Sequence, residues 1–133
     1  MSIGLRRAVA AFIAALALVY AVRAVGAAPD AYVYTERDVG RALTEAAQRH
    51  GVSRAFLRCI AFYETGGTFD PYAIGDDGRS HGAFQLYEHG LLPTFYAWGY
   101  TTPYSPYQAA DFVAAWGKRN GWQAWTPVRW GLC

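Results

Sequence analysis

The sequence has few side chains arranged to hold a metal ion. His81 and His89 lie eight residues apart, and no third ligand follows at metal-binding spacing. Asp70, Asp76 and Asp77 lack the alternating spacing and the closing glutamate of an EF-hand loop. We therefore expect no metal and no other cofactor, and we interpret Asp76-Asp77-Gly78 as a turn.

A hydrophobic run long enough to cross a membrane is also missing. Ala8 to Val22 is free of charge, but its 15 residues fall short of the roughly 20 that a spanning helix requires. With Arg6-Arg7 before it and the small residues Gly26-Ala27-Ala28 after it, the run fits a secretory signal. We predict a signal peptide over residues 1–28 and one domain over 29–133. An uncleaved anchor is the alternative, because Arg23 is a poor neighbour for a cleavage site.

The sequence carries no basic stripe that would attract nucleic acid. Arg6, Arg7 and Arg23 belong to the predicted signal, which leaves nine of the 12 basic residues against all 10 acidic ones. The net charge of residues 29–133 is therefore close to −1. We expect an exported monomer in the periplasm, cell wall or extracellular space, without nucleic acid and without a stable membrane span.

The chain has two cysteines, Cys59 and Cys133. In an exported protein an even pair predicts one disulfide, whereas two independent thiols are the alternative. A bond between them would fix residue 133 to the helix that precedes Glu64.

The remaining signals are mainly helical. Capping residues, apolar stripes at helical spacing and terminal glycines mark each predicted helix. These helices run from Thr35 to Gly51, from Ser53 to Glu64, over one or two turns within Leu91–Tyr100, and from Ser105 to Asn120. Ser105 and Gln108 have capping-box spacing, and residues 69–87 look like a loop with a short hairpin. The pattern predicts an all-α fold, with at most a small β-hairpin.

Glu64 stands out because of its place at the end of such a helix. Leu57, Ile60 and Ala61 precede it on the same helical face, and Gly66-Gly67 ends the helix. Burial and the helix dipole both disfavour the ionised form and would raise the pKa of its carboxyl. A general acid needs that property. The alternatives are a surface residue on a frayed helix end, or a structural carboxylate paired with Arg58 or Arg79.

The motifs around Glu64 resemble the catalytic core of the lysozyme-like superfamily. They read Glu-Thr-Gly-Gly-x-Phe-Asp-Pro over 64–71 and Ser-x-Gly-Ala-Phe-Gln-Leu over 80–86, and Gly-Trp-x-Ala-Trp over 121–125 resembles the closing segment of resuscitation-promoting factors. Soluble lytic transglycosylases and resuscitation-promoting factors are the most similar families. The resemblance implies a lysozyme-like fold, Glu64 as catalytic acid and Gln85 in the sugar cleft. Resuscitation-promoting factors also pair two cysteines in this region. The Ala-x-Tyr-Asn-x-Gly segment of many lytic transglycosylases is missing.

Aromatic residues are unusually numerous, with ten Tyr, seven Phe and five Trp. Flat rings stack on sugar rings, so some of them should line a groove. The full set of candidate rings is Tyr63, Tyr72, Phe84, Tyr87, Tyr96, Tyr104 and Trp125. We predict that peptidoglycan glycan strands are bound by Tyr63, Ser80, Phe84, Gln85, Tyr87 and Trp125.

The predicted reaction is cleavage of the β-1,4 bond between N-acetylmuramic acid and N-acetylglucosamine. Glycosidases commonly use two carboxylates, and only Asp70, Asp76 and Asp77 lie close to Glu64 in sequence. None of the three matches a catalytic residue of the families that the motifs resemble, and the lytic transglycosylases among them use a single catalytic Glu. A lytic transglycosylase is therefore favoured. A hydrolytic lysozyme-type or resuscitation-promoting-factor-like enzyme is the second possibility, and a catalytically silent carbohydrate-binding module is the third.

Overall fold

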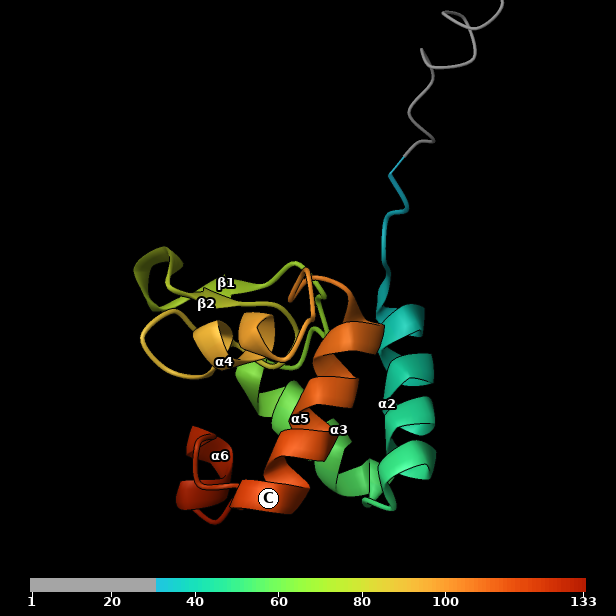
Figure 1. Ribbon diagram of the computed structural model, residues 1–133, viewed down its shortest axis with the longest axis vertical. Coiled ribbons are helices and arrows are strands. Elements are labelled where there is room, and N and C mark those ends of the chain that lie inside the picture. The colour runs from blue at the N-terminus through green and yellow to red at the C-terminus, as the bar shows by residue number, and fades with distance from the viewer. Residues whose placement is uncertain (1–30) are drawn as a thin grey trace, which may run out of the picture. The chain divides into compact units, whose positions relative to one another are not determined.

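Five α-helices and three short strands make up the part of the chain that the structure describes, residues 31–133 of this computed structural model (Figure 1). The helices are α2 (Glu36–His50), α3 (Arg54–Glu64), α4 (Leu91–Ala97), α5 (Pro106–Asn120) and α6 (Thr126–Arg129). The strands are β1 (Ile74–Gly75), β2 (Ser80–His81) and β3 (Leu86–Tyr87). The mainly helical fold with a small sheet is thus confirmed, whereas the predicted signal peptide lies outside the described residues. Among residues 31–133 no helix has the length and apolar character required to cross a membrane.

The first two helices begin and end as the sequence predicts. The backbone N–H of Thr35 donates to the Asp38 carboxylate at 2.8 Å, which completes a capping box, and Gly51 ends α2 in the left-handed region at φ 65°. Ser53 caps α3 by accepting a hydrogen bond from the backbone N–H of Phe56 at 3.2 Å. Glu64 is consequently the last residue of α3.

The core forms where α5 packs along α2, side by side in Figure 1. Alanines on both helices allow the two backbones to approach closely, and Phe95 and Phe112 fill the centre. Asp38 is only 3% exposed and accepts a hydrogen bond from the Tyr107 hydroxyl of α5 at 2.9 Å, so the helix cap also joins the two helices.

One predicted capping box forms only in part. The Ser105 hydroxyl accepts from the Gln108 backbone N–H, as expected for an N-cap. The Gln108 side chain instead accepts from the backbone N–H of Thr101 at 2.7 Å, because the preceding loop folds back beside the first turn of α5. This side chain therefore fixes the loop rather than the helix end.

The segment between α3 and α4 forms a three-stranded antiparallel sheet, one strand more than a hairpin. Strand order is β1-β2-β3, with Gly75 opposite Ser80 and Ser80 opposite Tyr87. A single 3-10 turn, Asp76–Gly78, joins β1 to β2, and Asp76 and Asp77 both have positive φ, at 51° and 55°. The turn predicted at Asp76-Asp77-Gly78 is therefore present, in a conformation that few residues other than glycine adopt.

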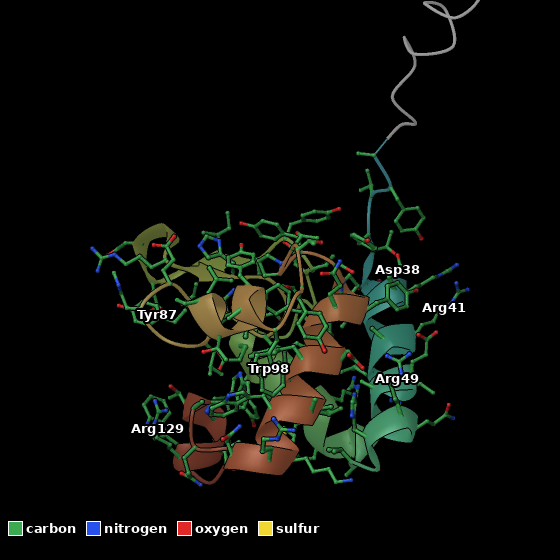
Figure 2. The ribbon with its side chains drawn as sticks, viewed as in Figure 1. Asp38, Arg41, Arg49, Tyr87, Trp98 and Arg129 are labelled. Atoms are coloured by element: carbon green, nitrogen blue, oxygen red, sulfur yellow. A yellow bond between two sulfur atoms is a disulfide. The ribbon has the colours of Figure 1, made fainter. Side chains whose placement is uncertain are left out.

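The C-terminal segment returns to α3. Cys59 and Cys133 lie at disulfide distance, with an S–S separation of 2.11 Å, in agreement with the predicted pairing. The short helix α6 follows Trp125 and packs against α3. In Figure 2, Tyr87 and Arg129 project on the side of the domain opposite to Arg41 and Arg49 of α2. Tyr87 and Arg129 both line the cleft described below.

Candidate active site

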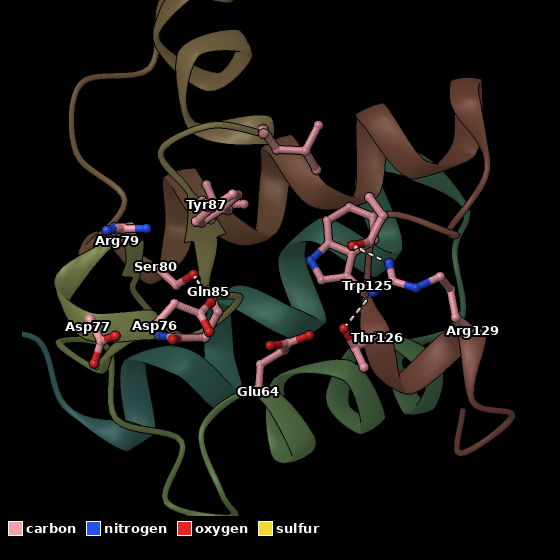
Figure 3. A pocket seen from close by; sticks show the side chains of 14 residues that line it. Glu64, Asp76, Asp77, Arg79, Ser80, Gln85, Tyr87, Trp125, Thr126 and Arg129 are labelled. Carbon is pink, nitrogen blue, oxygen red and sulfur yellow. Dashed lines mark hydrogen bonds between the residues drawn. The ribbon is translucent and has the colours of Figure 1, made fainter.

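A cleft of about 670 Å³ lies at the C-terminal end of α3 (Figure 3). The sheet and its turn form one wall, and the segment around α6 forms the other. Its size is within the range of roughly 300–1,000 Å³ that is usual for ligand pockets. The lining residues are Glu64, Asp76, Asp77, Arg79, Ser80, Gln85, Leu86, Tyr87, Gly90, Leu91, Ala124, Trp125, Thr126 and Arg129.

Glu64 lies between the two walls, as Figure 3 shows. No ion pair between 31 and 133 involves its carboxyl group, and none of the hydrogen bonds found there reaches it. Burial, followed by the negative charge of Asp76, raises the pKa of Glu64 to about 7, and the Arg129 guanidinium opposes this shift. A structural ion pair with Arg58 or Arg79, one of the alternatives open from the sequence, is not what the geometry shows.

Asp76 is held in the cleft by a buried serine. Ser80 is only 1% exposed, and its hydroxyl donates a hydrogen bond to the Asp76 carboxylate. Together with the positive φ of Asp76, this contact fixes the carboxylate on the wall beside Glu64. Ser80 thus borders the cleft as predicted, but its hydroxyl positions Asp76.

Gln85 occupies the cleft with a fixed amide. Its Nε2 donates to the backbone carbonyls of Ala73, at 3.1 Å, and Gly82, at 3.0 Å. Because both partners are acceptors, they determine which end of the amide carries the nitrogen. The oxygen Oε1 lies over Gly75, where an added Cβ would come within 2.3 Å of it. Gln85 therefore keeps only its Oε1 for a ligand, and only glycine at position 75 allows this placement.

Trp125 forms part of the opposite wall. It is 3% exposed, and its indole Nε1 donates to the backbone carbonyl of Phe84 at 3.2 Å. Trp116 and Trp122 pack against it at ring-centroid distances of 5.9 Å. The ring of Trp125 is therefore held firmly and little of it is available to a ligand, whereas Tyr87 on the facing sheet is 37% exposed.

Arg129 brings a positive charge to the same wall. Its Nη1 donates to the backbone carbonyls of Gln123, at 2.7 Å, and Ala124, at 3.1 Å, and its Nη2 donates to the Thr126 hydroxyl at 2.7 Å. Figure 3 shows the guanidinium held against this loop. Arginine is thus pre-organised opposite the acidic turn, and the cleft has charges of both signs on its two walls.

Most of the predicted site residues come together, and two do not. Glu64, Ser80, Gln85, Tyr87 and Trp125 line the cleft. Phe84 is 1% exposed in the core and contributes only the carbonyl that holds Trp125. Tyr63 is 45% exposed and packs edge-on against Phe62, outside the cleft. The substrate-binding role predicted for these two side chains does not agree with the geometry.

The cleft contains two functional candidates that the sequence pattern did not single out, Arg129 and Thr126, and it also contains Arg79, considered from the sequence only as an ion-pair partner of Glu64. Within residues 31–133, no three His, Cys, Asp or Glu side chains are grouped so that they could hold a metal ion. Comparison of the chain with protein-family models, curated proteins and solved structures gives no match. The geometry of the cleft is therefore the main basis for a function.

Proposed function

We propose that this protein is an exported peptidoglycan-cleaving enzyme with a lysozyme-like fold, and that it acts as a lytic transglycosylase on the bond between N-acetylmuramic acid and N-acetylglucosamine. One observation carries the proposal: the carboxyl of Glu64 sits in a cleft without an ion-pair partner, and its pKa is about 7. A carboxyl in that state can donate a proton at neutral pH, which an ordinary surface glutamate cannot.

A pKa near 7 also suits a mechanism with a single catalytic group. In the proposed reaction Glu64 first protonates the glycosidic oxygen as the bond breaks. The same carboxylate then takes the proton of the 6-hydroxyl of the muramic acid residue as that oxygen attacks C1. The product is a 1,6-anhydro sugar and no water is consumed. Donation and acceptance are both efficient only if the pKa of the group lies close to the working pH.

The other cleft residues fit a sugar strand. Gln85 Oε1 can accept a hydrogen bond from a hydroxyl or an acetamido N–H, since its Nε2 is already committed to the backbone. The exposed ring of Tyr87 offers an apolar face on the same wall. The negative charge of Asp76 would stabilise positive charge that develops at C1 in the transition state.

Hydrolysis is the second candidate function, and Asp76 is the observation in its favour. Asp76 shares the cleft with Glu64, interacts with it electrostatically, and is fixed by Ser80. Two carboxyl groups on opposite sides of a bond are the usual equipment of a glycoside hydrolase. In that reaction Asp76 would act as nucleophile or general base, and the product would keep a reducing end.

Digestion of purified sacculi followed by mass spectrometry separates these functions. A transglycosylase releases fragments with 1,6-anhydro ends, and a hydrolase releases fragments heavier by one water. Glu64→Gln should reduce release at least a hundredfold, because general acid–base catalysis contributes roughly 10²–10⁴-fold. Glu45→Gln, a change of the same kind on the exposed face of α2, is the matched control and should leave release unchanged.

A silent binding module on the same scaffold gives a different outcome. The wild-type protein would then bind sacculi without releasing any fragment, and Glu64→Gln would not alter the pattern. That result would refute both proposed activities.

A further inference from the structure

A second cavity of about 500 Å³ lies beside His81 of β2 and is otherwise lined by residues of α4 and of the loops around it. At two places in the sheet segment consecutive residues line different cavities, although Leu86 and Tyr87 of β3 both line the first cleft. Ser80 lines the active-site cleft and His81 the second cavity, and Tyr87 and Glu88 are divided in the same way. Because residues adjacent in the chain line the two cavities, one polymer could contact both.

A hydrogen-bonded triad occupies the second cavity. His81 Nδ1 lies 2.7 Å from the Tyr104 hydroxyl, and His81 Nε2 lies 3.0 Å from Glu88 Oε1. A carboxylate only accepts, so in the uncharged ring Nε2–H donates to Glu88 and Nδ1 accepts from Tyr104. The ring thus uses one oxygen of Glu88. The other oxygen belongs to a side chain that is 45% exposed.

The cavity is negatively charged and partly aromatic. None of its seven lining residues is Lys or Arg, so Glu88 supplies the formal charge when His81 is neutral. Tyr96, which is 48% exposed, is one of the lining residues, and Leu92, Pro93 and Pro103 supply apolar surface. Burial, then the proximity of Tyr96 and Glu88, raises the pKa of Tyr104. A carboxylate beside tyrosine rings and aliphatic surface suits an ammonium group on a methylene stem.

A sugar ring is a poorer match for this cavity. Tyr72 stacks on Tyr104 with a centroid distance of 5.8 Å and an interplanar angle of 25°, and His81 packs edge-on against Tyr104 at 5.9 Å. One face of Tyr104 is therefore already covered by Tyr72, which leaves less ring surface for a pyranose. Charge complementarity favours a cation instead.

We propose that this second cavity, lined by His81, Glu88, Leu92, Tyr96 and Tyr104, binds the free side-chain ammonium group of a diamino acid in the peptides attached to the glycan strand. The choice of the peptide as source rests on the proposed function, because the strand cleaved in one cavity would carry the peptide that reaches the other. Glu88 pairs with the ammonium group, and the apolar residues contact its methylene stem. The enzyme would then distinguish strands with free peptide amines from strands without them.

Titration by ¹H–¹⁵N NMR with Nα-acetyl-lysine methylamide tests the site itself, with the disulfide intact. The backbone amide signals of Glu88, Leu92 and Tyr104 should shift, and that of Arg129 should not. The same probe acetylated on its side-chain nitrogen should bind much more weakly. Glu88→Gln preserves an acceptor for His81 and should weaken binding of the free amine roughly three- to tenfold, as expected for an exposed ion pair with a cation–π contact.

Glu64→Gln is the matched control for that titration and should bind the probe like wild type. The site would be overturned if both probes bind equally, if the shifts appear at Arg129, or if Glu88→Gln binds like wild type. Tyr96→Ala offers a second test at a side chain that is 48% exposed and outside the buried core, and it should weaken binding in the same direction.

A binding experiment without catalysis tests the peptide as the source. Glu64→Gln should bind intact sacculi more tightly than sacculi whose amines have been acetylated, and adding Glu88→Gln should abolish the difference. Equal binding to both preparations would refute the peptide amine as ligand. If the wild-type protein releases no fragments, the glycan-cleaving function fails. The sacculus-binding experiment would still decide whether the wall peptide is the ligand, and the probe titration would still decide whether the ammonium site exists.

Discussion

Replacing Glu64 by Gln should stabilise the protein at neutral pH, and the size of the gain follows from the cleft. The pKa of this carboxyl is about 7 in the folded protein, against 4.5 for the same group when unperturbed. At about 1.36 kcal/mol per pKa unit, that interval corresponds to about 3 kcal/mol. Partial exposure of the side chain to solvent reduces the figure, so we expect about 2 kcal/mol.

The sign of the effect depends on pH. A carboxyl whose pKa is raised by folding disfavours the folded state once it ionises, since the unfolded chain ionises first. Below about pH 4 the carboxyl is protonated in both the folded and the unfolded chain. The difference in unfolding free energy between wild type and Glu64→Gln should therefore not change with pH there. Between pH 4.5 and 7 wild type should lose stability relative to the variant, and above pH 7 the difference should stay constant.

Urea denaturation of both proteins at pH 4 to 8, followed by tryptophan fluorescence, measures this curve directly. Glu45→Gln should show no such dependence, because Glu45 is exposed on α2. If Glu64→Gln proves less stable than wild type at neutral pH, then Glu64 is a paired structural carboxylate. A pH-independent difference would show that its ionisation is not linked to folding. Either result would remove the physical basis of the proposed acid.

Three further predictions concern the cleft and its covalent link. Asp76→Asn keeps an acceptor for the Ser80 hydroxyl but removes a negative charge that, after burial, raises the pKa of Glu64. The alkaline limb of the pH–activity profile should therefore move to lower pH, and the products should still carry anhydro ends. Complete loss of activity would instead favour hydrolysis. Gly75→Ala should displace Gln85 and lower the rate of sacculus digestion by roughly tenfold or more, and wild-type rates would contradict the role of Gln85 Oε1. Cys133→Ser removes the disulfide to Cys59, which lies 74 positions earlier in the chain. The unfolding free energy should fall by about 4 kcal/mol in the chain-entropy model, and the mass of the products should not change.

Local signals in the sequence were sufficient for the helices and for the place of Glu64. Caps such as Thr35 and Ser53 satisfy backbone groups within a few residues, so their effect can be read without knowing the rest of the fold. The burial of Glu64 follows in the same way from the apolar stripe of α3 that precedes it. The direction of its pKa shift was predicted, although the charge of Asp76 was not among the predicted causes.

Residues that meet only through the tertiary fold escaped prediction. Arg129 lies 65 positions after Glu64 in the chain, and nothing in its own neighbourhood indicates that α6 faces the end of α3. Phe84 was wrongly grouped with Gln85 because the two belong to one motif. Adjacent residues point in different directions, so Gln85 faces the cleft, with a positive φ of 48°, while Phe84 fills the core.

The attachment of residue 133 to α3 has a consequence for how the cleft can move. Cys59 lies five residues before Glu64 on the same helix, so the floor of the cleft and the wall that carries Arg129 are joined by a covalent bond as well as by packing. The acidic turn on the facing wall has no such tether and rests on hydrogen bonds such as the one from Ser80. Widening of the cleft, as the proposed glycan strand enters or its product leaves, should therefore come from displacement of the sheet. Arg129 and Glu64 would keep their mutual distance throughout the cycle.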